Sequence, residues 1–277
     1  MSDNNEEQFD MENLDDTELK FTVGLVGDNA ITDYLKFAFT RPRNEIFQVA
    51  GTVDIEDLID AGPHIVFIAT EVNRNEDGVV EASELEDHVL RVLARTNAGI
   101  VIKTSLPIEL VDRLCSKNKR IVYNPDMITE SGTALEKANV PAQILGGHPS
   151  ATMALQEIYF RFTQLKIHSF GHVSAVEAAL IEHGIAAALA MKAIFYNQLY
   201  DVCQDFGAGY INVSGYIGQD PRFGSSMSFV PTLKLNRGYD NQRMIDATKD
   251  LVKFNDRFTL LKECDIMNDA YQAQTKE

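Results

Sequence analysis

The residues after the first predicted strand are candidates for binding a dinucleotide. The fingerprint of such a turn is Gly-x-Gly-x-x-Gly, because the middle glycine lets the backbone approach a pyrophosphate and the last lets the helix pack on the sheet. Here Gly27–Thr32 reads Gly-Asp-Asn-Ala-Ile-Thr, and only the first glycine is present. The Asn29 side chain would crowd a phosphate, and Asp28 adds a negative charge. NAD binding stays open, but the sequence predicts that it is weakened.

Asp54 is a second candidate for the same cofactor. It follows the second predicted strand at the distance where a carboxylate accepts a hydrogen bond from the ribose of NAD. An acidic residue also commonly begins the next helix, so a lone Asp54 does not by itself establish the site.

The cysteines and histidines favour neither a disulfide framework nor a metal site. The three cysteines, Cys115, Cys203 and Cys264, are widely separated and form no Cys-x-x-Cys pair. No histidine lies near a cysteine in metal-ligand spacing. We therefore expect no metal, and thiols that are free and buried or incidental.

The charge of the chain is concentrated at one end. The formal net charge is −16, and residues 1–19 contain eight acidic residues and no basic one. This segment has few apolar residues, so we expect a disordered, solubilising tail; docking to a basic partner is the alternative. An acidic chain repels phosphates, so nucleic acid is not an expected partner.

Short β-rich runs alternate with segments of helical periodicity after the tail. This alternation predicts an α/β fold with a doubly wound parallel sheet of the Rossmann type. The expected strands are Phe21–Gly27, Phe47–Val53, His64–Ala69, Gly99–Lys103, Arg120–Asn124 and Ala142–Gly146. The expected helices between them are Ile31–Phe39, Ile55–Ala61, Ala82–Ala94 and Ile108–Lys117.

The rest of the chain is predicted to be helical. Helices are expected over Ser150–Thr163, over Val173–Phe206 and over Met244–Met267, with an irregular loop at Gly218–Arg243. In the first of these, the apolar residues Met153, Leu155, Ile158 and Phe162 are expected on one side. The middle of the long central helix is apolar nearly all round, so it either lies inside the monomer or forms a homodimer. The sequence thus divides into a tail (1–19), a dinucleotide-binding-like domain (20–148) and a helical domain (149–277).

The location of the protein is predicted from what the sequence lacks. No apolar run reaches the length needed to cross a bilayer, and the N-terminus is too acidic for a secretory signal peptide. We expect a cytoplasmic protein with no membrane partner.

Several motifs, in order, resemble the UDP-glucose and GDP-mannose dehydrogenase family. Val101–Pro107 resembles its Ser-Thr-Val-Pro segment, Tyr123–Ala134 its Asn-Pro-Glu-Phe-Leu motif, and Ile144–Gly147 its Ile-Gly-Gly. The long helix, Asp220–Gly224 and Lys249-Asp250 follow at the spacing of the family. The resemblance covers about residues 20–262. It implies a Rossmann domain that binds NAD, a dimer through the long helix, and a short form of two domains.

The chemistry that this resemblance implies is the four-electron oxidation of a sugar C6 alcohol to a carboxylate. A cysteine thiolate captures the aldehyde as a thioester, and a lysine and an asparagine on the long helix stabilise the oxyanion. Aligned on Lys249-Asp250, the cysteine position holds Asp246. Aligned on the long helix, the lysine position holds Glu182 and the asparagine position holds Ala186. All three catalytic identities are therefore predicted to be lost.

Other positions carry over from the family as binding residues. The resemblance places Ser105, Glu130 and Lys249 with Gly27, Asn29 and Asp54 around the cofactor. It places Asn124, Asp126 and Arg222 around a nucleotide sugar, and Glu130 and Asp250 near the chemistry. Alternatively, Asn124 terminates a strand and Arg222 pairs with Asp220.

Three hypotheses for function follow. The first is a catalytically impaired nucleotide-sugar dehydrogenase homologue, retained for binding, regulation or structure. The second is an active NAD-dependent oxidoreductase with altered chemistry, in which Asp246 or Glu130 acts as a general base. The third is an assembly protein that uses the fold as a scaffold.

Overall fold

A computed structural model describes residues 20–51, 54–75, 80–125, 138–224, 245, 249–251 and 259–274. The chain forms two compact units, which divide between Leu180 and Ile181. Segment 149–180, which the sequence analysis assigned to the helical domain, thus lies in the first unit. The reason is visible in the core, where Leu155, Ile158 and Tyr159 pack under the sheet.

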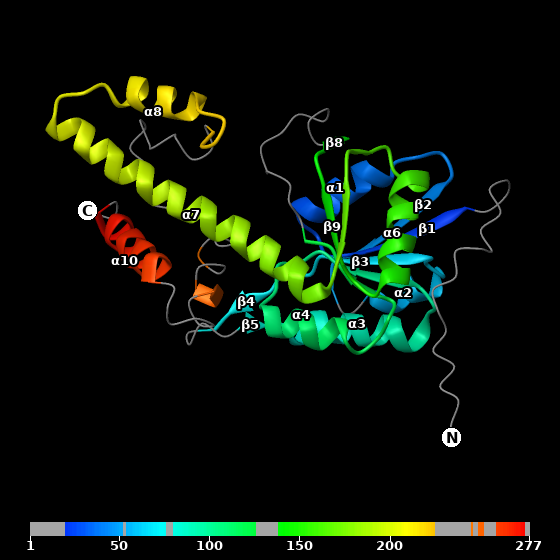
Figure 1. The fold of residues 1–277 in the computed structure, drawn as a ribbon. Helices are drawn as coiled ribbons and strands as arrows, with labels where there is room; N and C mark the ends of the chain where they lie inside the picture. The colour runs from blue at the N-terminus through cyan, green and yellow to red at the C-terminus, as the bar shows by residue number, and fades with distance from the viewer. Residues whose placement is uncertain are drawn as a thin grey trace. The chain divides into compact units, whose positions relative to one another are not determined.

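The first unit is built on a seven-stranded sheet of order β11-β9-β7-β6-β3-β1-β2 (Figure 1). Five neighbouring strands are parallel, β9 is antiparallel to β7, and β11 is parallel to β9. The strands are β1 (Phe21–Val26), β2 (Asn44–Val49), β3 (Ile65–Ile68), β6 (Gly99–Ile102), β7 (Ile121–Tyr123), β9 (Gln143–Gly147) and β11 (Phe170–Val173). Strand order reverses at β1, which lies between β2 and β3. The Rossmann-type α/β fold is confirmed.

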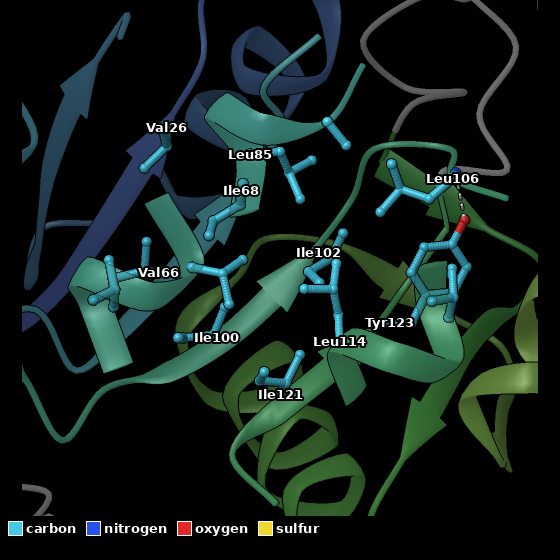
Figure 2. Close-up of a cluster of buried hydrophobic side chains, with 14 of the residues drawn as sticks. Val26, Val66, Ile68, Leu85, Ile100, Ile102, Leu106, Leu114, Ile121 and Tyr123 are labelled. Atoms are coloured by element: carbon cyan, nitrogen blue, oxygen red, sulfur yellow. Dashed lines mark hydrogen bonds between the residues drawn. The ribbon is translucent and has the colours of Figure 1, made fainter. Parts of the chain in front are cut away.

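Helices cover both faces of this sheet, and each face has its own apolar core. One core includes Val26, Val66, Ile68, Ile100 and Ile102 (Figure 2). Against it pack α2 (Ile55–Asp60), α3 (Ser83–Arg95), α4 (Ile108–Cys115) and the start of α7 (Ala175–Asp205). The opposite face is covered by α1 (Ala30–Phe39) and α6 (Pro149–Phe162). Met153 on α6, expected on the same side as Leu155 and Ile158, is 66% exposed, because α6 turns Ala151, Leu155 and Ile158 inward.

Several elements of the first unit differ from the sequence expectations. β2 begins at Asn44 and ends at Val49, because its register with β1 pairs Asn44 with Phe21 and Val49 with Val26. The edge strand β11 was not predicted: it lies between the helices expected over Ser150–Thr163 and Val173–Phe206, and only Val173 overlaps one of them. Two small sheets were also not predicted: β4 (Asn73–Arg74) with β5 (Val80–Glu81), and β8 (Asn139–Val140) with β10 (Lys166–Ile167).

The second unit holds most of α7 with α8 (Tyr210–Gln219) and α10 (Thr259–Gln274). α8 was not predicted as a helix. Of the helix expected over Met244–Met267, the described residues are helical: Ile245, Lys249–Leu251 and the start of α10 from Thr259. Ala190, Ala193 and Ile194 of α7 pack with Cys264 of α10, and Tyr196 and Cys203 of α7 pack with Tyr210 of α8. The acidic tail and most of the segment 225–258 lie outside the described residues.

α7 is the one described helix that passes a membrane-span test by length and composition. Its most apolar window has a mean hydropathy of 1.5, and half of that window is buried inside the protein. It also carries the buried polar side chains Glu182, His183 and Asn197. These features are those of a core helix.

Candidate functional site

The turn between β1 and α1 lies at the carboxyl edge of the sheet, where strand order reverses. Open α/β sheets bind ligands at such a crevice. Gly27 has φ +125°, and an added Cβ would lie 2.7 Å from the Ala69 carbonyl oxygen. Only glycine fits there, so the one fingerprint glycine that survives is required by the fold itself.

The Asn29 side chain closes this turn. Its Oδ1 accepts from the N–H groups of Ile31 (3.1 Å) and Thr32 (3.3 Å), and the Asn29 N–H donates to Thr32 Oγ1 at 3.0 Å. Together these bonds form a capping box at the start of α1. The Asn29 Nδ2 also donates to the Ala69 carbonyl at 2.7 Å, across the gap between β1 and β3.

Side-chain hydrogen bonds continue along the same edge. Thr104 Oγ1 donates to the Thr70 carbonyl at 2.8 Å, and Thr70 Oγ1 lies 2.9 Å from Nδ1 of buried His88. The Leu106 N–H donates to the Tyr123 hydroxyl at 3.4 Å (Figure 2). These contacts fix the segment after β6, in which Ser105 is half-buried.

Asn124, at the end of β7, is fully buried and its amide is fully used. Its Oδ1 accepts from Lys103 Nζ (3.2 Å) and the Tyr159 hydroxyl (2.6 Å). Its Nδ2 donates to Gln143 Oε1 (2.8 Å) and the Ile144 carbonyl (2.9 Å). An amide side chain has two acceptor and two donor positions. Asn124 therefore joins β7 to β6, β9 and α6, and has no hydrogen-bonding capacity left for a substrate.

Asp54 lies at the N-cap of α2, is exposed, and makes no side-chain capping bond. It follows the end of β2 by five residues, so it is not at the strand end itself. The residues at the carboxyl edge do not fit a dinucleotide with its pyrophosphate at α1. Two N–H groups in the first turn of α1, those of Ile31 and Thr32, are already bonded to the Asn29 side chain.

In the second unit, the helix positions aligned with the family's catalytic lysine and asparagine lie on one side of α7. Glu182 and Ala186 are four residues apart, and both are buried. His183, next to Glu182, is also buried, and its Nε2 lies 3.4 Å from Oδ2 of buried Asp250. The structure thus brings the Lys249-Asp250 motif against the turn of α7 that carries Glu182.

Lys249 and Arg222 lie on the surface of this unit. Lys249 is exposed. Burial raises the pKa of Asp265 on α10, and the positive charge of Lys249 partly opposes this rise. The Arg222 guanidinium donates to both carboxylate oxygens of Asp220, at 3.0 and 2.6 Å. This local pair is the alternative that the sequence left open for Arg222.

No cysteine of the chain has the environment of a reactive thiolate. Burial raises the pKa of Cys115 to about 12. Burial raises the pKa of Cys264 as well, with Asp265 and Glu263 adding to the effect. Cys203 is 3% exposed, packed among tyrosines. A nucleophilic cysteine requires a lowered pKa and some exposure.

Three predicted site residues, Asp246, Asp126 and Glu130, lie outside the described residues. Within the described ranges, no group of three potential ligands could hold a metal ion. His168 and His172 are four residues apart, a spacing common among metal ligands, but they contact Asn139 and Thr152 respectively.

The sequence analysis overlooked Gln48, Thr70, His88, Tyr159 and His183. Only His183 had a usable signal, because it adjoins the Glu182 position on the helix.

The fold and these positions define a Rossmann-type α/β protein with a second, helical unit. No protein-family model matches the chain. It is 25% identical over 241 residues to a UDP-glucose 6-dehydrogenase of Bacillus subtilis, covering 80% of this chain and 53% of that protein. It is 27% identical over 217 residues to a UDP-glucose 6-dehydrogenase of Rhizobium meliloti, covering 73% and 48%. The chain spans about half the length of these relatives.

Solved structures share the fold. A UDP-glucose dehydrogenase from Pyrobaculum islandicum superposes with a TM-score of 0.70 at 14% identity, covering 93% of this chain and 70% of that one. A GDP-mannose dehydrogenase from Pseudomonas aeruginosa gives a TM-score of 0.61 at 14% identity, covering 90% and 68%. The sequence matches support the resemblance to nucleotide-sugar dehydrogenases, and the solved structures show that the chain shares their fold.

Proposed function

We propose that the protein is a nucleotide-sugar dehydrogenase homologue that does not carry out the oxidation of the sugar and serves a binding, regulatory or structural role. The observation that carries this proposal is the buried face of α7. There a carboxylate, Glu182, and a methyl group, Ala186, stand where the family resemblance calls for an ammonium group and an amide.

The chemistry of the missing groups supports the proposal. A developing oxyanion needs donors, and loss of one donor costs about 10²–10³ in rate. Glu182 offers a carboxylate at this position and would repel the oxyanion when ionised. The thioester step needs a nucleophilic thiolate, and burial disfavours the thiolate form at Cys115 and Cys264.

The test is turnover by the purified protein. We expect no NADH formation from NAD⁺ with UDP-glucose, UDP-N-acetyl sugars or GDP-mannose, measured by absorbance at stoichiometric enzyme. The same ligands are then screened by thermal shift, because a ligand at about 100 times its dissociation constant adds roughly 2.7 kcal/mol of stability. NADH production with any of these sugars would refute the proposal.

An active dehydrogenase with altered chemistry is the second candidate. The observation that favours it is the His183–Asp250 pair, because a histidine held by a carboxylate is a common general base. Such an enzyme would take the proton of the sugar hydroxyl and stop at the aldehyde. One NADH for each sugar consumed, lost in Asp250→Asn, would select this candidate over the first.

We also propose a homodimer through α7. Gly184, Ala188, Phe195 and Val202 follow one another at spacings of four, seven and seven residues, and all four are exposed. These spacings place them in one stripe along the helix, in which small residues allow a close approach and larger ones provide apolar area. The family resemblance, which implies a dimer at this helix, names a second copy as the partner.

Sedimentation velocity tests the dimer. Val202→Glu would place a charge in the stripe and is expected to convert the dimer to a monomer. Gln204→Glu, exposed on the opposite side of α7, is the matched control and should leave the mass unchanged. A monomeric wild type at micromolar concentration would exclude this interface.

A cytoplasmic location remains an expectation from the sequence.

A further inference from the structure

We infer that Asn29 takes the place of a dinucleotide pyrophosphate, so that the β1–α1 turn is closed from within and the first unit folds without NAD and does not bind it there. This inference concerns the first unit alone and does not depend on the proposed function.

Two hydrogen-bond donors at the start of α1 are already used within the protein. The start of a helix binds anions because its first N–H groups have no partner within the helix. At α1, the N–H groups of Ile31 and Thr32 are bonded to Asn29 Oδ1. A phosphate oxygen could use them only by displacing this amide, and the displaced amide would lose three hydrogen bonds.

The Asn29 amide also reaches across the crevice. Asn29 Nδ2 reaches the Ala69 carbonyl at the end of β3, whereas Gln48 Nε2 of β2 donates to the Gly27 carbonyl at 2.7 Å. The turn is therefore tied to both strands that flank β1. These are the two strands between which the sheet reverses its order, and a ligand at the crevice would have to break one of the ties.

The negative charge of Asp28 also opposes a pyrophosphate at this turn. Asp28 is exposed, next to Asn29, and adds a negative charge at the mouth of the turn. Gln48 Nε2 lies 3.4 Å from Asp28 Oδ1, a long contact with a neutral donor that does not cancel this charge. The closed form thus agrees with the local electrostatics, because a pyrophosphate would approach a carboxylate.

The experiment measures NAD⁺ and NADH binding by the full-length wild type, by isothermal titration calorimetry and by thermal shift at millimolar dinucleotide. We expect no binding heat and no rise in melting temperature. A dissociation constant below 1 mM for either dinucleotide would overturn the inference, and this measurement needs no variant to fold.

Two variants then test the role of Asn29 itself. Asn29→Gly removes the amide and is expected to lower the melting temperature by about 2–4 °C and to acquire a dinucleotide-dependent rise that the wild type lacks. Thr32→Val breaks the other half of the capping box but leaves the Asn29 side chain in place. It should lose similar stability without gaining the rise. If Asn29→Gly folds and gains nothing, or if both variants gain equally, Asn29 is not what closes the turn.

UDP-glucose, titrated in parallel, separates this inference from the proposed function. NADH formation from UDP-glucose contradicts the proposed function, whereas NAD⁺ binding without turnover contradicts only the closure by Asn29.

Discussion

The carboxyl edge of the sheet and the buried face of α7 hold their buried polar side chains in different ways. At the sheet edge, Asn29 and Asn124 are tied by hydrogen bonds to neighbouring strands, and each amide is satisfied within the protein. On α7, the ionisable side chains of Glu182 and His183 are buried next to one another, with Asp250 in contact.

This difference has a physical meaning. At the sheet edge both amides are hydrogen-bonded to backbone groups or to buried side chains, including the ammonium group of Lys103, and such bonds stabilise the fold whether or not a ligand binds. Buried ionisable groups cost free energy unless each is well paired, so they are a weak source of stability. The sheet edge therefore has the character of a structural element. The face of α7 is where a remaining activity or binding function should be sought.

The largest expected effect is at the sheet edge. Asn124→Ala removes four hydrogen bonds and leaves Lys103, Gln143 and Tyr159 buried without this partner. We expect a loss of about 3 kcal/mol in the free energy of unfolding, measured by urea denaturation. Exposed Asn97→Ala is the matched control and should change it by less than about 0.5 kcal/mol. A small effect at Asn124 would mean that the edge is not the structural element inferred above.

Asp250→Ala probes the second region in the same way. Removing the carboxylate leaves the His183 ring buried without this contact, and we expect a loss of about 2 kcal/mol from an unsatisfied buried group. The smaller value relative to Asn124 reflects one long contact of 3.4 Å against four bonds. If instead Asp250→Ala stabilises the protein, the contact of Asp250 with the buried face of α7 costs stability, as expected of a site kept for function.

The sequence predicted some elements of the fold and missed others. β1, β3, β6, β7 and the helices between them were predicted because their signal is local: short buried runs, each followed by a helical period. The edge strand β11 was missed because its pattern is only partly buried and contains Gly171 and His172. Its pairing with β9 comes from residues far away in the chain. Similarly, α8 contains Gly215 and the β-branched residues Ile211, Val213 and Ile217, which weaken a helical signal.

The candidate site shows the same limit. The closure by Asn29 had a sequence signal, because an asparagine followed three residues later by a threonine is a typical helix start. The saturation of Asn124 had none, since its partners Lys103, Gln143 and Tyr159 are twenty-one, nineteen and thirty-five residues away. Until these partners are known, an asparagine at a strand end fits a ligand-binding residue as well as it fits a structural one.

A smaller, pH-dependent effect is expected at His88. Burial lowers the pKa of His88 below its usual value near 6.5, so the folded state favours the neutral ring. Below about pH 6.5 the unfolded chain takes up the proton more readily than the folded one. The free energy of unfolding therefore falls as the pH decreases from 6.5, and the contribution is fully present above that value.

Replacing the ring tests this dependence. His88→Gln should flatten part of the fall in unfolding free energy between pH 6.5 and 5, measured by urea denaturation at each pH. Exposed His168→Gln is the control and should leave the slope as in the wild type. His64, whose pKa burial also lowers, accounts for slope that remains. An unchanged slope in His88→Gln would show that this ring is not held neutral.

The smallest effect is expected at Arg222, and it tests whether the second region binds a nucleotide sugar through that residue. Its guanidinium is bonded to Asp220 two residues away, and both side chains lie at the surface. Exposed pairs of this kind contribute little, so Arg222→Ala should leave the urea midpoint unchanged. If UDP-glucose raises the melting temperature of the wild type, the rise should persist in Arg222→Ala, because the local pair with Asp220 already satisfies the guanidinium. A rise that disappears would show that Arg222 leaves Asp220 to bind the ligand. The surface of the second unit, and not only its buried face, would then carry a binding function.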